Sequence, residues 1–435
     1  MKHTILIIAV LFVFSAGQAM TLEEAVALGK TRSLAQQKPR IEKLKARGQL
    51  DEAWSNALPQ IDGSVGYQRA IKKGKIFFPN PETGEFTALE LDQDNALQAN
   101  VTLNQPLFTF GRIAAGVRGA KAYSQAADHG VAQQNLQTEL DVMQRFWAVL
   151  TMREVVKARE LSLAVSDSSL SRAERMRGVG LLSDYDVLRV RVQAQNQRPA
   201  LDKARSDLQL AELSIKEYLG VPLDTSIVFE GNLTDFAMYV DTTSVEDKLR
   251  ERDDVSALRN AAVAQQNLYI IFKNARYPTL GGQVKYQWQW SNNEWDVNPR
   301  NNYSALYAGV SLSIPIWSSG ATHGKALQYK ADWRRAELNL VQAERGAKLQ
   351  YESATRDLNT AISNESAASL AVDLAEEARR IAQTKFAQGQ ITPLEMDSAQ
   401  LDELTARVSL ADANYRRLLA SAQVRLALGQ SPYAN

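Results

Sequence analysis

The chain has 435 residues, with 50 lysines and arginines against 49 aspartates and glutamates, three histidines and no cysteine. A net charge of +1 argues against a nucleic-acid partner, because general polyanion binders carry a clear basic excess. Without cysteine, the chain has no disulfide framework, thiolate zinc site, cysteine nucleophile or lipoprotein anchor.

The first twenty residues have the layout of a secretory signal peptide. A basic start is followed by an apolar run over Ile5–Phe14, and the small residues Gly17 and Ala19 suit cleavage after Ala19. Ten apolar residues are too few to span a bilayer, and no later segment approaches 18 consecutive apolar residues. We therefore predict a signal peptide over residues 1–19, and we expect any membrane-spanning part to consist of strands.

The remainder of the chain is an internal duplication. The segment Leu103–Gly111 recurs as Leu312–Gly320, and Gly180 corresponds to Gly389 at the same shift of 209 residues. These correspondences predict a first repeat over 20–220, a linker over 221–243, a second repeat over 244–429 and a tail over 430–435. Each repeat is expected to begin with a helical stretch, at about 22–54 and 245–274.

Alternating apolar and polar residues predict a β-hairpin in each repeat, over about 60–108 and 279–317. In the second repeat, for example, Tyr286, Trp288 and Trp290 alternate with polar neighbours. The hairpin tips are expected near 72–94 and 292–302. The first hairpin is ten residues longer than the second, a difference that belongs in a loop.

A very long helix is predicted after each hairpin, over about 112–175 and 321–386, because neither range contains proline. At 1.5 Å per residue, about 64 residues span roughly 95 Å. In the second range, small apolar residues recur every seven positions, which predicts supercoiled packing. They are Leu340, Ala347, Ala354, Ala361, Ala368, Ala375 and Ala382. The first range has a bulkier version, built from Leu136, Leu140, Met143, Trp147, Leu150 and Leu161.

The signal peptide, the duplicated halves and the element L-x-x-P-[LI]-[FW]-x-x-G after each hairpin together resemble the TolC-like outer membrane efflux protein family. The resemblance implies a mainly α-helical fold with a membrane β-barrel. In that family a homotrimer shares one 12-stranded barrel, which continues as a coiled-coil helical tunnel across the periplasm of a Gram-negative cell. It also implies an outer-membrane exit duct for tripartite efflux or type I secretion. Its partners would be a periplasmic adaptor, an inner-membrane transporter and outer-membrane lipid.

The residues favour the same architecture independently. Four strands cannot close a barrel, and open edges cannot lie in hydrocarbon, whereas three copies supply twelve strands. Tyr67, Tyr286, Trp288 and Trp290 are expected to point outward as a membrane aromatic girdle. A soluble periplasmic coiled-coil adaptor or scaffold is the alternative interpretation. The duplication favours the duct, because adaptors usually have one hairpin inside nested β domains.

The turns between the long and short helices match in both repeats. Gly180 and Gly389 end the long helices, and an acidic residue follows six positions later, Asp186 in one repeat and Glu395 in the other. In one interpretation, these carboxylates only complement the dipoles of the helices that they begin.

The family resemblance implies a second role, because these turns form the gated periplasmic entrance in that family. Asp186 and Glu395 would contribute to acidic rings that favour cations. Asp397 lies one residue before the family's second acidic position. Arg177 and Phe386 fall near positions that link the gate, although phenylalanine cannot form a hydrogen bond.

No enzyme chemistry is predicted, and we expect no catalytic residue, metal site or cofactor. His129 and His323 lie on or beside long polar helices, and neither has a second histidine or a carboxylate at a distinctive ligand spacing.

Overall fold

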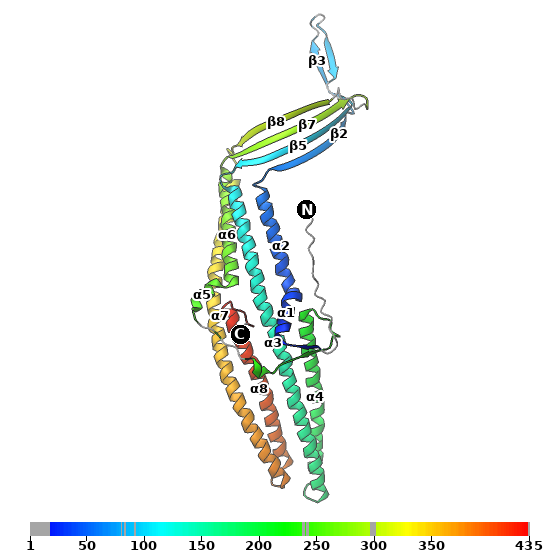
Figure 1. The fold of residues 1–435 in the computed structure, drawn as a ribbon, viewed down its shortest axis with the longest axis vertical. Coiled ribbons are helices and arrows are strands. Elements are labelled where there is room, and N and C mark those ends of the chain that lie inside the picture. The colour runs from blue at the N-terminus through cyan, green and yellow to red at the C-terminus, as the bar shows by residue number, and fades with distance from the viewer. Residues whose placement is uncertain are drawn as a thin grey trace. The chain divides into compact units, whose positions relative to one another are not determined.

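The computed structural model describes residues 18–79, 81, 84–90, 93–236, 240, 243–295 and 302–433. The chain forms two compact units (Figure 1), of which unit 1 comprises residues 1–42, 128–257 and 341–435. Unit 2 comprises residues 43–127 and 258–340. Most of the predicted signal peptide lies outside the described residues. Its last two residues, Gln18 and Ala19, begin the short strand β1 (Gln18–Met20).

Unit 2 contains a four-stranded antiparallel sheet in the order β2-β5-β7-β8 (Figure 1). The strands are β2 (Gln60–Arg69), β5 (Asn95–Phe108), β7 (Thr279–Asn292) and β8 (Asn302–Ser313). Each repeat supplies one hairpin, and the central pair β5–β7 joins the two repeats. The strands β2 and β8 form the two edges of the sheet.

The sheet has one apolar and one polar face, because its register aligns residues of one kind across all four strands. Ile61, Leu103, Val284 and Ala308 form one apolar row, and most of the other rows on that face are also apolar. The intervening rows on the opposite face are mainly polar. One of them consists of Asp62, Thr102, Lys285 and Tyr307. The predicted alternation is therefore present, and it places the apolar side chains of both repeats on one surface.

The predicted first hairpin tip, over 72–94, contains a further two-stranded hairpin that the sequence did not indicate. Its strands, β3 (Lys75–Pro79) and β4 (Phe86–Glu90), pair antiparallel. Aromatic and β-branched residues such as Ile76, Phe77 and Phe78 favour extended backbone, which explains why this longer connection forms strands.

The predicted helical stretch at the start of each repeat is broken in two. The first consists of α1 (Leu22–Arg32) and α2 (Leu34–Ser55), and the second of α5 (Val245–Glu251) and α6 (Asp253–Lys273). The interruptions are at Ser33 and Arg252, whose backbones have ψ angles of 135° and 139°. These residues are 219 positions apart, so the break is itself duplicated.

Each repeat then has a long helix followed by a shorter one. The long helices are α3 (Arg112–Gly178) and α7 (Ala321–Ala387), each of 67 residues. The shorter helices are α4 (Asp184–Leu219) and α8 (Pro393–Ala427). Helix α4 continues through Pro199. None of the described helices is both long and apolar enough to cross a membrane.

The core of unit 1 lies around the middle of α3. Phe146 and Trp147 are fully buried, and they pack with Phe229 of strand β6 (Ile227–Phe229), which pairs with β1. The 3₁₀ turn η1 (Leu233–Asp235) adds Leu233 to this cluster. Leu161 is 40% exposed, so the bulky seam predicted along α3 does not extend to this residue.

The alanine seam of α7 faces α8. Ala347, Ala354 and Ala361 are buried, and Ala354 packs with Val424 and Leu428 at the end of α8. The buried alanines are spaced by seven residues, so one side of α7 is buried at the interval that the sequence predicts.

Candidate functional site

The two helix turns of unit 1 have the same backbone geometry. Gly180 and Gly389 have φ angles of 78° and 71°, in the left-handed region that favours glycine. The amide of Leu181 donates to the carbonyl of Met176, and the amide of Gln390 donates to that of Lys385, both at 2.9 Å. These bonds satisfy the last carbonyls of α3 and α7 and reverse the chain into α4 and α8.

The two predicted acidic residues cap the helices that follow. The amide of Asp186 donates to Ser183 Oγ at 3.2 Å, and Ser183 Oγ donates to Asp186 Oδ2 at 2.7 Å. In α8, the amide of Thr392 donates to Glu395 Oε2 at 2.7 Å, which completes a capping box. The Thr392 amide and, secondarily, its hydroxyl hold the pKa of Glu395 below its ordinary value. Both carboxylates therefore lie in the first turns of the helices that follow the glycines.

An apolar cluster packs the two turns against each other. Phe386 is only 2% exposed, and it packs with Met176 of α3, Val187 of α4 and Met396 of α8. Phe386 thus contributes to the site by packing and not by a hydrogen-bonded link. Arg177 Nη1 lies 3.4 Å from Asp184 Oδ1, so it connects α3 to α4 within one turn.

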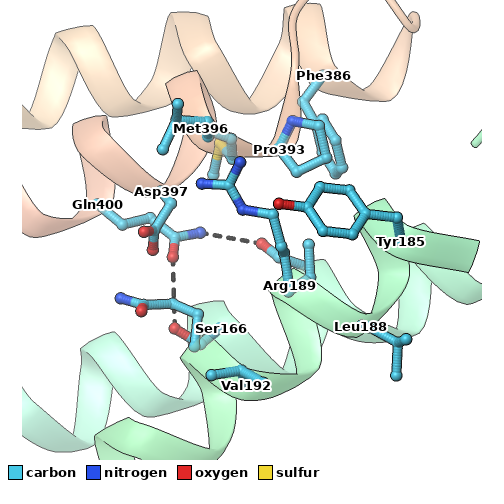
Figure 2. A pocket seen from close by; sticks show the side chains of 14 residues that line it. Ser166, Tyr185, Leu188, Arg189, Val192, Phe386, Pro393, Met396, Asp397 and Gln400 are labelled. Carbon is cyan, nitrogen blue, oxygen red and sulfur yellow. Dashed lines mark hydrogen bonds between the residues drawn. The ribbon is translucent and has the colours of Figure 1, made fainter. Parts of the chain in front are cut away.

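A cavity of about 410 Å³ opens beside this cluster, lined by residues of α3, α4 and α8 together with Phe386 (Figure 2). Figure 2 shows the Arg189 side chain extending from α4 toward Met396 and Pro393 of α8. Asp397 also lines the cavity. Burial raises the pKa of its carboxyl, against the opposing effects of a hydrogen bond from Gln193 and the positive charge of Arg189.

A hydrogen-bonded clamp joins the two repeats at this cavity. Gln400 of α8 is buried, accepts a bond from Ser166 Oγ at 3.3 Å and donates one to Ser169 Oγ at 2.9 Å (Figure 2). Sequence reasoning missed this residue. The duplication could not have revealed it, because the corresponding position in the first repeat is Arg191.

A buried ion network lies nearby, between α7 and α8. Glu403 is only 4% exposed, and it pairs with Arg379 and with Arg407 Nε, the latter at 3.0 Å. Arg407 also pairs with Glu376. Removal of one partner would leave a buried charge uncompensated, so this network fixes how α7 and α8 pack.

The four residues of the predicted aromatic girdle lie on one face of the sheet. Tyr67 and Tyr286 are exposed on the apolar face of the sheet, and Trp288 is half-buried there. Trp290 is 0% exposed, and Trp295 of the hairpin tip packs edge-on against it with ring centroids 5.5 Å apart.

The described residues contain no group of three or more histidines or carboxylates placed to hold a metal ion. His129 Nδ1 lies 2.7 Å from Asp253 Oδ1, a pairing of α3 with α6 that sequence spacing could not reveal.

The chain was compared with known protein families. The chain matches the model described as "Outer membrane efflux protein" in two segments, residues 26–221 and 245–430.

The chain is also similar to individual proteins, of which three are described here. The chain is 24% identical to the outer membrane efflux protein BepC of Brucella suis, over 86% of this chain and 77% of BepC. It is 24% identical to the cobalt-zinc-cadmium resistance protein CzcC of Cupriavidus metallidurans, over 60% of this chain and 59% of CzcC. The CmeC outer membrane channel of Campylobacter jejuni has the same fold, with a TM-score of 0.80, 17% identity and coverage of 95% of this chain and 87% of CmeC.

Proposed function

Because the chain belongs to the outer membrane efflux protein family, we propose that it is a passive exit duct gated at its two helix turns. Three copies would share one 12-stranded barrel in the outer membrane. The helices of unit 1 would form a tunnel in the periplasm.

The observation that carries this proposal is the sheet of unit 2. Its strands have 10 to 14 residues, enough to cross a bilayer as tilted strands. Its apolar face exposes large side chains, including Val65, Leu306 and Val310. Within the described part of the chain, the edges β2 and β8 each have one strand partner. Strand edges are not tolerated in hydrocarbon, so other copies of the chain must pair with them.

The helix turns support the gating part of the proposal. Asp186 and Glu395 would place six carboxylates around a threefold entrance, which favours cations over anions. The Gln400 clamp and the cluster around Phe386 connect the turns of the two repeats, so they would hold the entrance closed.

The partners follow from the proposed path of the cargo. A passive duct needs an energised transporter in the inner membrane and a periplasmic adaptor that connects the two, as in tripartite efflux systems. Of the relatives, BepC is named for efflux and CzcC for cobalt, zinc and cadmium resistance. We therefore place this chain in an efflux system.

The mass of the detergent-solubilised particle tests the proposal. Three chains of 48.2 kDa predict a protein mass of about 145 kDa after subtraction of the micelle, or slightly less once a signal peptide is removed. The particle should also remain in the outer-membrane fraction after a salt wash. A single-chain mass, or release without detergent, would instead indicate a periplasmic scaffold.

A further inference from the structure

We propose that unit 2 carries a binding site for the phosphate headgroup of an anionic phospholipid, at the junction of its sheet and helices. The site is a cavity of about 440 Å³, which we call the junction cavity. Its polar lining consists of Lys273, Arg276, Ser318, Thr322, His323 and Lys330. The proposal rests on the proposed insertion of the sheet into a membrane.

The charge of the junction cavity favours an anion. Three of its lining residues, Lys273, Arg276 and Lys330, are basic, and its lining includes no carboxylate. Within the described part of the chain, none of the three forms an ion pair. Four other cations of α7 are balanced locally, for example Arg335 by Asp332 at 2.8 Å. A cluster of unbalanced cations is a recognition site for phosphate.

The walls of the junction cavity are fixed. Helices α6 and α7 are joined by two aromatic stacks, Phe272 on Tyr329 with centroids 3.9 Å apart and Tyr269 on Trp333 at 5.8 Å. The 3₁₀ turn η2 (Asn274–Arg276) carries Arg276, whose Nη2 donates to Tyr277 Oη at 3.0 Å. The cations are thus held by rigid elements, which lowers the entropic cost of ordering them around a ligand.

The position of the cavity favours a lipid over a soluble anion. It lies where β8 ends and α7 begins, and the connecting residues Ile316 and Trp317 are 92% and 85% exposed. Tryptophan is enriched at the boundary between hydrocarbon and water, where lipid phosphates also lie. Leu312, at the end of the apolar sheet face, is also exposed, so acyl chains would have an apolar surface beside the headgroup.

The fold itself does not require these cations. At the corresponding positions of the first repeat, Lys273, Arg276 and His323 are replaced by Trp54, Ala57 and Ala114. Lys330 alone has a basic counterpart, Lys121. The cluster of three cations is therefore a feature of the second repeat, and three chains would carry three such sites around the proposed barrel.

The test is native mass spectrometry of the full-length protein in mild detergent, titrated with phosphatidylglycerol. The variant K273Q/K330Q should bind the lipid about 30-fold more weakly than wild type, from the usual contribution of a basic residue near anionic lipid. The matched control K121Q/K325Q removes two exposed lysines of α3 and α7 outside the cavity, and it should bind within about twofold of wild type. The variant K273R/K330R should retain binding.

Three results would overturn the assignment. Equal weakening in K273Q/K330Q and the control would indicate a general charge effect. Displacement of the lipid by inorganic phosphate at equal concentration would identify a soluble-anion site. A lower oligomer mass of K273Q/K330Q without lipid dependence would assign the cations to an acidic surface of a second copy. Conductance of the wild type in planar bilayers distinguishes failure of the lipid proposal from failure of the duct proposal. A wild type that conducts ions but binds the lipid no better than K273Q/K330Q would contradict the lipid site alone.

Discussion

At the scale of single residues, two carboxylates combine a structural and a proposed functional role. Asp186 and Glu395 accept hydrogen bonds from the residues that cap α4 and α8, so their oxygens are held at the helix turns. Asparagine and glutamine keep an acceptor oxygen at these positions while removing the charge. Charge and capping can therefore be separated by substitution.

We expect the double variant D186N/E395Q to form channels with a weaker cation preference. The permeability ratio of potassium to chloride should fall about twofold or more, because the entrance loses its fixed negative charges. Reversal potentials across a salt gradient in planar bilayers measure this ratio. The control E352Q/D357N removes two exposed charges of α7 away from the turn, and it should leave the ratio unchanged. Equal ratios in both variants would leave the carboxylates as helix caps only.

The stabilising effect of the Glu395 charge should depend on pH. Its pKa is lowered from 4.5 in the folded protein, mainly by the Thr392 amide, so the ionised carboxylate stabilises the native state above about pH 4.5. This contribution is lost as the pH falls through the lowered pKa. Unfolding midpoints of wild type and E395Q should therefore differ at pH 7 and become more similar as the pH is lowered below 4.5. A difference that does not change with pH would have another origin.

At the scale of helices, contacts between the repeats determine the closed state that we propose. The Gln400 clamp joins α8 to α3, and the cluster around Phe386 joins all four helices at the turns. Gln400 is the clearer target, since its bonds can be removed without changing the apolar cluster.

The variant Q400L should raise the resting conductance of the channel. It also leaves the hydroxyls of Ser166 and Ser169 without their partner, which should cost about 1–3 kcal/mol in stability. The triple variant Q400L/S166A/S169A removes both sides of the clamp, so it should recover most of the stability while the conductance stays high. Exposed Ser398 supplies the control, S398A. If the conductance is high only in the variants that are destabilised, the Gln400 clamp does not hold the entrance closed.

The alanine seam should not tolerate larger side chains. Ala354 packs against Val424 and Leu428, so A354L should destabilise the protein by about 1–3 kcal/mol through overpacking. Ala367 lies on the exposed side of the same helix, and A367L should have little effect. Thermal unfolding in detergent compares the two variants, and similar midpoints would show that the seam is not tightly packed.

At the scale of the whole molecule, the central question is what pairs with the two sheet edges. The absence of cysteine makes cross-linking unambiguous, because every disulfide must form between introduced residues. A cysteine at Val310 of β8 can be combined with one at each position from Ile61 to Tyr67 of β2.

If β2 of one copy pairs with β8 of the next, oxidation should produce covalent trimers. Cross-linking should be strong at alternate positions only, because successive side chains of a strand point to opposite faces. Denaturing gels without reductant measure the products. The absence of trimers at every position, or equal cross-linking at all of them, would contradict strand pairing between copies.

The sequence by itself determined the features that repeat locally. Period-two alternation identified the two faces of the sheet, seven-residue spacing identified the alanine seam, and the glycine-centred turns identified the helix ends. Such patterns record which side of an element is buried, because burial follows the period of the element. The sequence did not locate the break at Ser33, because its neighbours Arg32 and Leu34 are compatible with a continuous helix.

Only the tertiary structure decided which neighbour each side chain contacts. Gln400 lies 231 residues from Ser169 in the chain, and the buried Trp290 packs against Trp295 of the hairpin tip. The cations of the junction cavity likewise come from α6, η2 and α7, which fold together around two aromatic stacks. Periodicity specifies a buried face but not its partner, since many partners satisfy the same apolar pattern and folding selects among them through contacts distant in sequence.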